Sequence, residues 1–248
     1  MSLPASTTSK YPSLNKFKDE NYVESHDGRE IALLKHIYSH PDLNELRGSP
    51  SNILRVIDEF AAQQDFLINI GPDKGDKVQK LIEDEKPTVL VELGGYVGYS
   101  SILFAEAMRR AHGGTKQDLR FWSLEFDPLM ASIAMNFIDL AGLSDIVTVV
   151  VGSAADSIKR LHAEKKLTTI DFLFLDHVED LYIDDLKVCE NLSLLRPGSM
   201  VVADNVLRPG APQYREYVRQ HIGMESWSVK GLIIPGDYED ELEVSRIK

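Results

Sequence analysis

Oxygen-bearing side chains follow two apolar runs of the sequence, at the point where each run ends. Asp176 and His177 follow "IDFLFL", and Asp204 and Asn205 follow "MVVA". If these runs are neighbouring strands of one sheet, Asp176, Asp204 and Asn205 meet at its edge. An all-oxygen set without cysteine suits a hard cation, and a small ligand number leaves room for water and substrate, which favours Mg²⁺. The alternative is helix capping or loop bracing, but two such pairs side by side favour a metal site.

A glycine turn follows an earlier apolar run, in "TVLVELGGYVGYSS". Gly94, Gly95 and Gly98 permit a tight turn into a helix whose free amide groups face a ligand. The dinucleotide fingerprint fails because Leu93 stands where its first glycine is required, and this disfavours a nicotinamide-dependent dehydrogenase. Glu92 lies inside the run, where a carboxylate is costly without a partner. An amino-bearing ligand would supply that partner.

A second carboxylate, Glu125, ends the run "RFWSLE" at a typical distance beyond the glycine turn for accepting hydrogen bonds from ribose hydroxyls. The alternative is a carboxylate at a helix start, but Asp127 before Pro128 fits that role better. Together with Glu92, this favours a nucleoside cofactor with a positively charged, amino-acid-like end. S-adenosylmethionine fits that description better than a dinucleotide does.

The elements that must position these residues alternate between short apolar runs and helical patterns from Pro87 onward. These runs are "TVLVEL", "RFWSLEF", "IVTVVVG", "IDFLFLDH" and "MVVADNV". All five are almost continuously hydrophobic, which is typical of strands buried on both faces of a parallel sheet. Two further strand candidates in the tail, "SWSVKGLII" and "ELEVSRIK", are close enough to pair antiparallel at one edge. We therefore predict an α/β fold with a doubly wound, mostly parallel, seven-stranded sheet and an antiparallel edge strand.

The domain organisation predicted for the chain is simple. Residues 1–25 are rich in Ser, Thr, Pro and Lys and are expected to form a flexible arm. Residues 26–248 are expected to form a single domain, with a helical cover over 26–86 and the sheet core over 87–248.

Composition restricts the class of protein. The chain has 248 residues and a formal net charge of -12, which argues against binding to nucleic acid or to an anionic membrane. Its single cysteine, Cys189, suits a reducing compartment and is expected to be buried and inert. No signal peptide or membrane-spanning run is apparent. We expect a cytoplasmic, soluble monomer.

The chain resembles the catechol O-methyltransferase family from about Phe66 to Ala211. The matching motifs are "NIGPDKG", "VELGGYVGYSS", "LEFDP", "VVGSAAD", "LDHVEDLY" and "ADNVLRPGAP". The resemblance implies the Rossmann-like fold of class I methyltransferases. It also implies transfer of the methyl group of S-adenosylmethionine to one hydroxyl of a catechol chelated by Mg²⁺.

The resemblance also implies roles for individual positions. The metal ligands would be Asp176, Asp204 and Asn205, and Glu125 would hold the ribose. The methionine end of the cofactor would be surrounded by Ile70, Glu92, Gly94, Tyr96 and Ser100. Asp176 would be a further residue that contacts the cofactor. Ser153 and His177 would lie near the adenine.

The chain departs from the family pattern at several positions. The lysine expected as general base is replaced by Glu179, and Lys74 in "PDKG" is a second candidate for that role. Phe66 and Val178 stand where the family has tryptophans around the substrate, whereas the substrate-contacting Pro209 is retained. Asp237 is the best match for the acid that accepts the second hydroxyl, and Asn205 would also contact substrate.

Three functions remain open from the sequence. The first is methylation of a catechol or catechol-like small molecule, and the second is cation-dependent methylation of a bulkier vicinal-diol phenolic. The third is a catalytically weak S-adenosylmethionine-binding protein, because Glu179 replaces the expected base.

Overall fold

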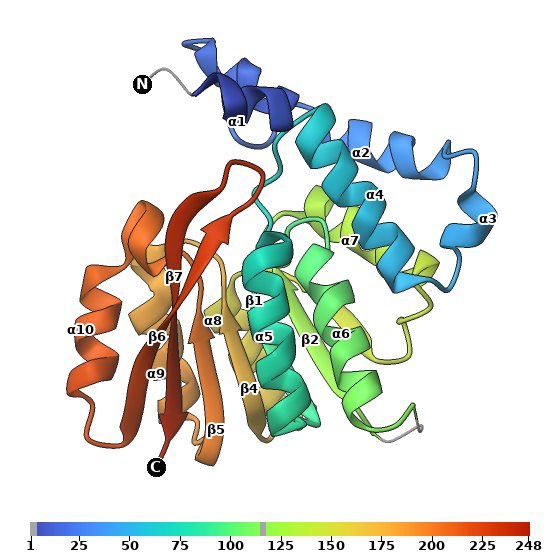
Figure 1. The fold of residues 1–248 in the computed structure, drawn as a ribbon. Helices are drawn as coiled ribbons and strands as arrows, with labels where there is room; N and C mark the ends of the chain where they lie inside the picture. Colours follow the sequence, from blue (N-terminus) through green and yellow to red (C-terminus); the bar gives the residue numbers. More distant parts are fainter. Residues whose placement is uncertain (1–3, 115–117) are drawn as a thin grey trace.

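A seven-stranded sheet forms the centre of the computed structural model, which describes residues 4–114 and 118–248 (Figure 1). The strand order is β3-β2-β1-β4-β5-β7-β6. The strands are β1 Val89–Leu93, β2 Arg120–Glu125, β3 Val147–Val151, β4 Ile170–Leu175, β5 Leu195–Ala203, β6 Met224–Ile233 and β7 Tyr238–Ile247. β1 to β5 are parallel, and β7 is antiparallel to both β5 and β6. The predicted fold class is confirmed, with the antiparallel strand one position in from the edge.

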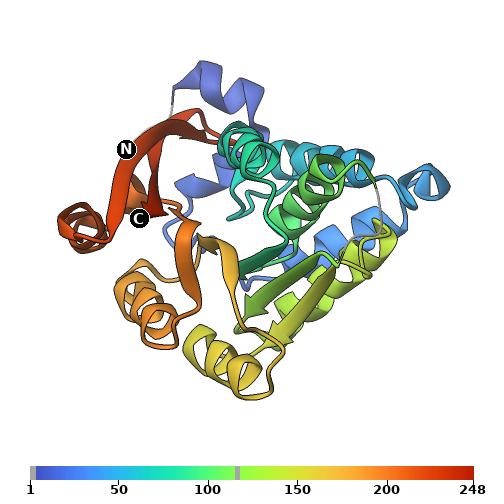
Figure 2. The same cartoon turned by 90° about the horizontal axis from the view of Figure 1, so that it is seen from below.

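Helices cover both faces of the sheet (Figure 2). One face carries α5 Gly71–Glu85, α6 Tyr99–Ala111 and α7 Pro128–Leu140, and the other carries α8 Ala154–Ala163, α9 Tyr182–Asn191 and α10 Pro212–Gln220. Successive strand residues point to opposite faces, so Leu90 joins the first core and Val91 the second. This explains why the runs are almost continuously hydrophobic.

The order of the strands changes direction between β1 and β4. The chain leaves β1 towards β2 by way of α6 on one face, whereas α9 follows β4 on the opposite face. The two connections therefore separate above the carboxyl ends of β1 and β4. In open α/β sheets, ligands bind in the crevice formed at such a switch point.

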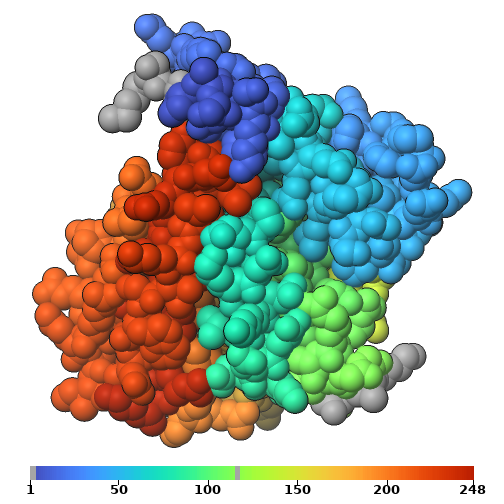
Figure 3. Space-filling model, in the orientation of Figure 1, coloured from blue at the N-terminus to red at the C-terminus, as the bar shows by residue number. Residues whose placement is uncertain are grey.

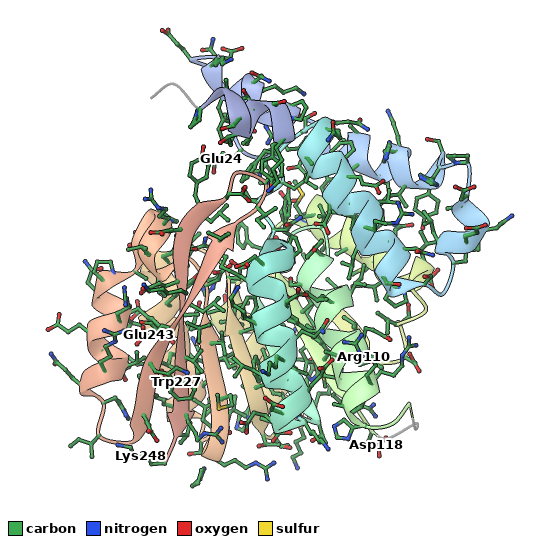
Figure 4. All side chains as sticks on the ribbon, viewed as in Figure 1. Glu24, Arg110, Asp118, Trp227, Glu243 and Lys248 are labelled. Carbon is green, nitrogen blue, oxygen red and sulfur yellow. The ribbon has the colours of Figure 1, made fainter. Side chains whose placement is uncertain are left out.

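The antiparallel strand β7 is fastened to the helix beside it by buried charge. Glu243, labelled in Figure 4, is fully buried on β7, and it accepts hydrogen bonds at 2.7 and 2.9 Å from Arg219 on α10. Arg215, on the same helix, lies 3.3 Å from the same carboxylate. A buried carboxylate is tolerated here because two guanidinium groups compensate it.

The amino-terminal elements are α1 Ala5–Lys10, the 3-10 helix η1 Pro12–Lys18, α2 Arg29–Tyr38, α3 Leu43–Leu46 and α4 Pro50–Gln63. Within residues 4–25 the structure differs from the flexible arm that we expected. Tyr11 and Leu14 are buried in a small core with Phe66, and Lys10 pairs with Asp237 at 2.8 Å. The composition is polar, but these few apolar side chains share one face and bury it. Figure 3 shows this blue segment resting on the red hairpin.

None of the helices in the described part of the chain combines the length and the apolar character needed to cross a membrane.

Candidate functional site

The register of the central strands brings the predicted metal ligands together. Leu93, Leu175 and Ala203 are aligned at the ends of β1, β4 and β5. The backbone hydrogen bonds between neighbouring strands extend one residue beyond the strand ends. Asp176 N donates to Leu93 O, and Asp204 N donates to Leu175 O, both at 2.9 Å. The two carboxylates therefore leave adjacent strand ends.

The electrostatics of the two aspartates reflect this proximity. Burial, and then the neighbouring carboxylate of Asp204, raises the pKa of Asp176 well above its ordinary value. Burial also raises the pKa of Asp204, although the ammonium group of Lys74 opposes that effect. Carboxylates that repel each other in this way attract a cation.

Four side-chain oxygens at this edge have no hydrogen-bond partner among residues 4–114 and 118–248. Asp204 Oδ1 accepts hydrogen bonds from Lys74 Nζ at 2.5 Å and from Asn205 N at 2.7 Å, which leaves Oδ2. Asn205 Nδ2 donates to Arg208 O and to Asp240, which leaves Oδ1. No hydrogen bond reaches the carboxylate of Asp176. Two carboxylates and one amide oxygen form a donor set that fits a hard cation.

The described residues contain no group of three or more His, Cys, Asp and Glu side chains that could hold a metal ion. The set predicted from the sequence has only two such side chains and an amide, so a cation held there would need water and substrate to complete its coordination.

Lys74, one of the two candidate bases, is engaged in a buried ion-pair network. Its Nζ donates to Asp204 Oδ1 at 2.5 Å and to Asp240 Oδ2 at 2.7 Å. Burial alone would lower its pKa, but the two carboxylates outweigh burial and raise it. The ammonium form is therefore favoured, whereas a general base must be neutral.

Glu92 is fully buried at the end of β1, as expected of a strand residue. Its Oε2 accepts hydrogen bonds from Ser101 Oγ at 2.5 Å and Ser123 Oγ at 2.7 Å. Its Oε1 is buried without a partner among the described residues. Burial raises the pKa of Glu92, and the serine hydroxyls oppose that rise. A charged donor from a ligand would satisfy the free oxygen.

The glycine turn is braced by Glu125 and lies directly against the backbone at the end of β4. Glu125 Oε2 accepts hydrogen bonds from Gly95 N at 3.1 Å and Tyr96 N at 2.8 Å. Gly94 has a φ of 92°, and a Cβ there would lie 2.3 Å from the carbonyl oxygen of Asp176. Glycine is required at this position because the two strand ends touch.

The other predicted cofactor residues line the same end of the sheet. Ile70 and Ser100 are buried at the first turns of α5 and α6, and Ser153 accepts a hydrogen bond from Asp156 N as the cap of α8. His177 Nε2 lies 2.8 Å from Asp185 Oδ2, and its buried Nδ1 has no partner among the described residues. The carboxylate therefore holds the imidazole ring in place.

Tyr96 connects the glycine turn to the helical cover. Its hydroxyl donates to Glu30 Oε1 at 2.8 Å, and Glu30 is buried at the start of α2. Burial, and then the Glu30 carboxylate, raises the pKa of Tyr96, so the hydroxyl remains a donor. A role for Glu30 was not predicted from the sequence, although its place in the first turn of an amphipathic helix was a signal.

The predicted substrate residues have different environments. Phe66 is buried, whereas Val178 is 59% exposed and Pro209 is also exposed. Glu179 is partly buried and begins the 3-10 helix η2 Glu179–Leu181 directly after Val178.

Asp237, the predicted acceptor of a second hydroxyl, is engaged by the amino-terminal segment. Its carboxylate accepts hydrogen bonds from Lys10 Nζ at 2.8 Å and Tyr11 Oη at 2.9 Å. The hydrogen bond from Lys10 contributes most to lowering the pKa of Asp237. The nearby acid that instead reaches the candidate metal ligands is Asp240, which was not predicted from the sequence. It lies on the same face of β7 as the core residues Leu242 and Val244, two and four residues further on, and this inward position was its signal.

Comparison with known proteins supports the same family. The model of the O-methyltransferase family matches residues 45–223, more than half of the chain. Bovine catechol O-methyltransferase (Bos taurus) is 35% identical over 191 residues, covering 77% of this chain and 66% of the bovine protein. Catechol O-methyltransferase B of Danio rerio is 35% identical over 217 residues, covering 88% of this chain and 78% of that protein.

A solved structure extends the likeness to nearly the whole fold. The O-methyltransferase from Bacillus cereus, determined in complex with SAH, superposes with a TM-score of 0.66 at 20% identity. The superposition covers 98% of this chain and 100% of the other. On the strength of the family model and of these relatives, the chain belongs to the O-methyltransferase family.

Proposed function

We propose that the protein transfers the methyl group of S-adenosylmethionine to one hydroxyl of a catechol-like small molecule chelated by Mg²⁺. The observation that carries the proposal is the group of open oxygens on Asp176, Asp204 and Asn205, next to the glycine turn and the unpaired Oε1 of Glu92. The names of the bovine and zebrafish relatives, and the SAH bound to the Bacillus cereus enzyme, support this choice of substrate and cofactor.

The cofactor would supply an electrophilic methyl group on a sulfonium. Glu92 Oε1 would accept a hydrogen bond from its ammonium group, and Glu125 would accept hydrogen bonds from the ribose hydroxyls. The residues that would surround the methionine end are Ile70, Gly94, Tyr96, Ser100 and Asp176, and Ser153 and His177 would lie near the adenine. The fit rests on the buried free oxygen of Glu92, which an ammonium group satisfies.

Bound Mg²⁺ would lower the pKa of a coordinated hydroxyl and hold both substrate oxygens in place. Asp176, Asp204 Oδ2 and Asn205 Oδ1 would bind it, because their oxygens accept no hydrogen bond from any residue that the structure describes. Positioning the substrate oxygen for the transfer then supplies much of the rate.

Glu179 is the proposed base. It lies three residues after Asp176, at the start of η2, and its charge contributes to raising the pKa of Asp176, which supports this choice. The Glu179 carboxylate would accept the hydroxyl proton. Lys74 suits this role less well because its ammonium group already pairs with Asp204 and Asp240.

Methyl transfer to catechol tests the proposal. With labelled cofactor and Mg²⁺, the purified protein should methylate catechol, and excess EDTA should abolish the reaction. Asp176→Asn should lower the rate at least about 100-fold because it removes one of two charged ligands. The control is Asp184→Asn, an exposed aspartate on α9, which should retain the wild-type rate. Absence of product from a broad catechol panel would refute the assignment.

A bulkier vicinal-diol phenolic is the second candidate substrate. Phe66 and Val178 are smaller than the tryptophans that the family resemblance leads us to expect, so a slot for the substrate ring would be wider between them. Comparing kcat/KM across diols of increasing size would decide between the two. A preference for catechol itself would reject the bulkier class.

The replacement of the expected lysine by Glu179 motivates a test of catalytic competence. If the protein binds cofactor but is impaired in transfer, Glu179→Lys should raise catechol turnover strongly. An unchanged rate would show that the cation carries the deprotonation and that residue 179 has little share in it. Binding of cofactor measured by calorimetry, with no turnover of any diol, would instead support a binding protein.

A further inference from the structure

The carboxylate of Asp240 is the centre of a buried network that none of the proposed catalytic steps uses. Asp240 is 1% exposed on β7. Its Oδ1 accepts hydrogen bonds from the backbone amides of Leu207 at 3.2 Å and Arg208 at 2.9 Å. Its Oδ2 accepts hydrogen bonds from Lys74 Nζ at 2.7 Å and from Asn205 Nδ2 at 3.1 Å. Both oxygens are therefore saturated, and Asp240 has no lone pair left for a substrate.

The network determines which end of the Asn205 amide is available. Asn205 Nδ2 has two acceptors as partners, Asp240 Oδ2 and the carbonyl oxygen of Arg208. A flipped amide would place Oδ1 against these two acceptors, which would be repulsive. The hydrogen bonds thus keep Nδ2 on the protein side and leave Oδ1 facing the cation position. Asn205 also has a φ of 56°, so its backbone is held in the left-handed region by the same turn.

The network also determines which carboxylate oxygen of Asp204 is available. Lys74 Nζ and the Asn205 backbone amide both donate to Oδ1, so Oδ2 is the free oxygen. Lys74 approaches from α5 across β6, where a Cβ on Gly231 would lie 2.4 Å from Lys74 Cγ. The absence of a side chain at Gly231 lets the lysine stem pass between the helix and the strand.

We propose that Asp240, acting together with Lys74, is a positioning residue that presents Asn205 Oδ1 and Asp204 Oδ2 to the divalent cation. The inference rests on the proposed function, since it concerns the cation of that same site. Partners of metal ligands typically change metal affinity by about 10- to 100-fold when they are removed. Asp240 would act through the ligands and would not itself touch substrate.

Direct measurement of metal affinity tests this inference without relying on activity. Mn²⁺ titrations followed by electron paramagnetic resonance would compare wild type with Asp240→Asn. The new amide nitrogen cannot accept a hydrogen bond, so the variant loses either the pair of contacts from Lys74 and Asn205 or the pair from the backbone amides of Leu207 and Arg208. The Kd for Mn²⁺ should therefore rise about tenfold or more. Glu241→Gln is the matched control, because Glu241 is the next residue on β7 and pairs with Arg215 at 2.7 Å, away from Asn205. The Kd of the Glu241→Gln variant for Mn²⁺ should change less than about twofold.

Further measurements separate positioning from general stability. Asp240→Asn should leave cofactor affinity within about twofold of wild type, and the Mg²⁺ concentration for half-maximal activity should rise with the Mn²⁺ Kd. If Asp240→Asn does not fold, Asp240→Glu keeps the charge opposite Lys74 and shifts the oxygens by one methylene. It should also weaken Mn²⁺ binding.

The outcomes distinguish the two proposals. Equal Mn²⁺ affinity in wild type and in the folded Asp240 variants would overturn the positioning role alone. A wild-type protein that binds no Mn²⁺ would overturn both the positioning role and the cation requirement of the proposed function.

Discussion

The unpaired Oε1 of Glu92 indicates a position where a hydrogen-bond donor of a ligand would bind. One carboxylate oxygen is satisfied by two serine hydroxyls, and the other is buried with no partner among the described residues. Leaving a buried acceptor unsatisfied costs about 1 to 3 kcal/mol, so the arrangement is favourable only when a ligand completes it.

Glu92→Gln is the first residue-scale prediction. The substitution keeps the shape and removes the charge, so the affinity for S-adenosylmethionine should fall about tenfold or more, as expected for a lost charge-assisted hydrogen bond. Isothermal titration calorimetry would measure the change. Glu83→Gln, which alters a surface pair with Arg110, should leave the affinity unchanged. Wild-type affinity in Glu92→Gln would remove Glu92 from the cofactor site.

Asp58 gives a prediction about pH. It lies on α4, and Tyr99 Oη donates to it at 3.1 Å. Burial raises the pKa of Asp58 from its ordinary value of 3.8 to about 7, and the hydrogen bond from Tyr99 opposes that rise. Between these two values, the folded protein retains a proton that the unfolded chain releases. The free energy of unfolding therefore falls as pH rises through this window and levels off above it.

Asp58→Asn should remove this dependence, because asparagine is neutral throughout. The difference in unfolding free energy between pH 4 and pH 8 should change by on the order of 2 to 4 kcal/mol relative to wild type, with the variant favoured at pH 8. Urea denaturation at both pH values would measure it. An identical pH difference in the two proteins would show that Asp58 is ionised in the fold.

At the scale of the elements, the amino-terminal segment is the clearest departure from expectation. Leu14 is fully buried against Tyr11 and Phe66, and Phe17 contacts the Phe66 ring with centroids 5.3 Å apart. The segment therefore backs the side chain that is proposed to wall the substrate slot. Lys10 and Tyr11 fasten it to Asp237 in the hairpin turn between β6 and β7.

Leu14→Ala should loosen this segment. Truncation of a fully buried leucine lowers the free energy of unfolding by about 2 to 4 kcal/mol. A loss of this size is comparable with the total stabilisation expected from so small a core. Limited proteolysis should then cut residues 4–25 faster than in wild type, and the KM for the substrate should rise because Phe66 loses its support. Leu129→Ala, at a position 46% exposed, is the control and should change neither. Proteolysis at the wild-type rate would show that the segment does not depend on Leu14.

At the scale of the whole molecule, the sequence predicted the features that depend on local pattern. Hydrophobic runs buried on both faces identified the central strands, and the carboxyl ends of parallel strands meet at one edge, so Asp176 and Asp204 could be placed together. The turn at Gly94 was recognised in the same way.

The features that the sequence did not predict depend on contacts between distant segments. The ion pairs of Lys74 span 130 and 166 positions along the chain. The residues near Lys74 in the sequence do not indicate that its ammonium group pairs with two aspartates. Asp237 and Asp240 lie in one short acidic stretch, and the path of the hairpin decides which of them reaches the site. The docking of residues 4–25 likewise depends on Phe66 and on the hairpin, and both lie far from it in sequence.

The dispersion of the Lys74 network along the chain has a consequence for biosynthesis. On the ribosome, Lys74 and Asp204 emerge well before Asp240, which lies on the last strand of the sheet. Until β7 inserts between β5 and β6, Lys74 in a growing chain lacks Asp240, one of its two carboxylate partners. The side-chain amide of Asn205 then has only one of its two acceptors, the carbonyl oxygen of Arg208. A nascent polypeptide would thus acquire its cation-binding geometry only at the final step of sheet assembly, after the surrounding core has formed.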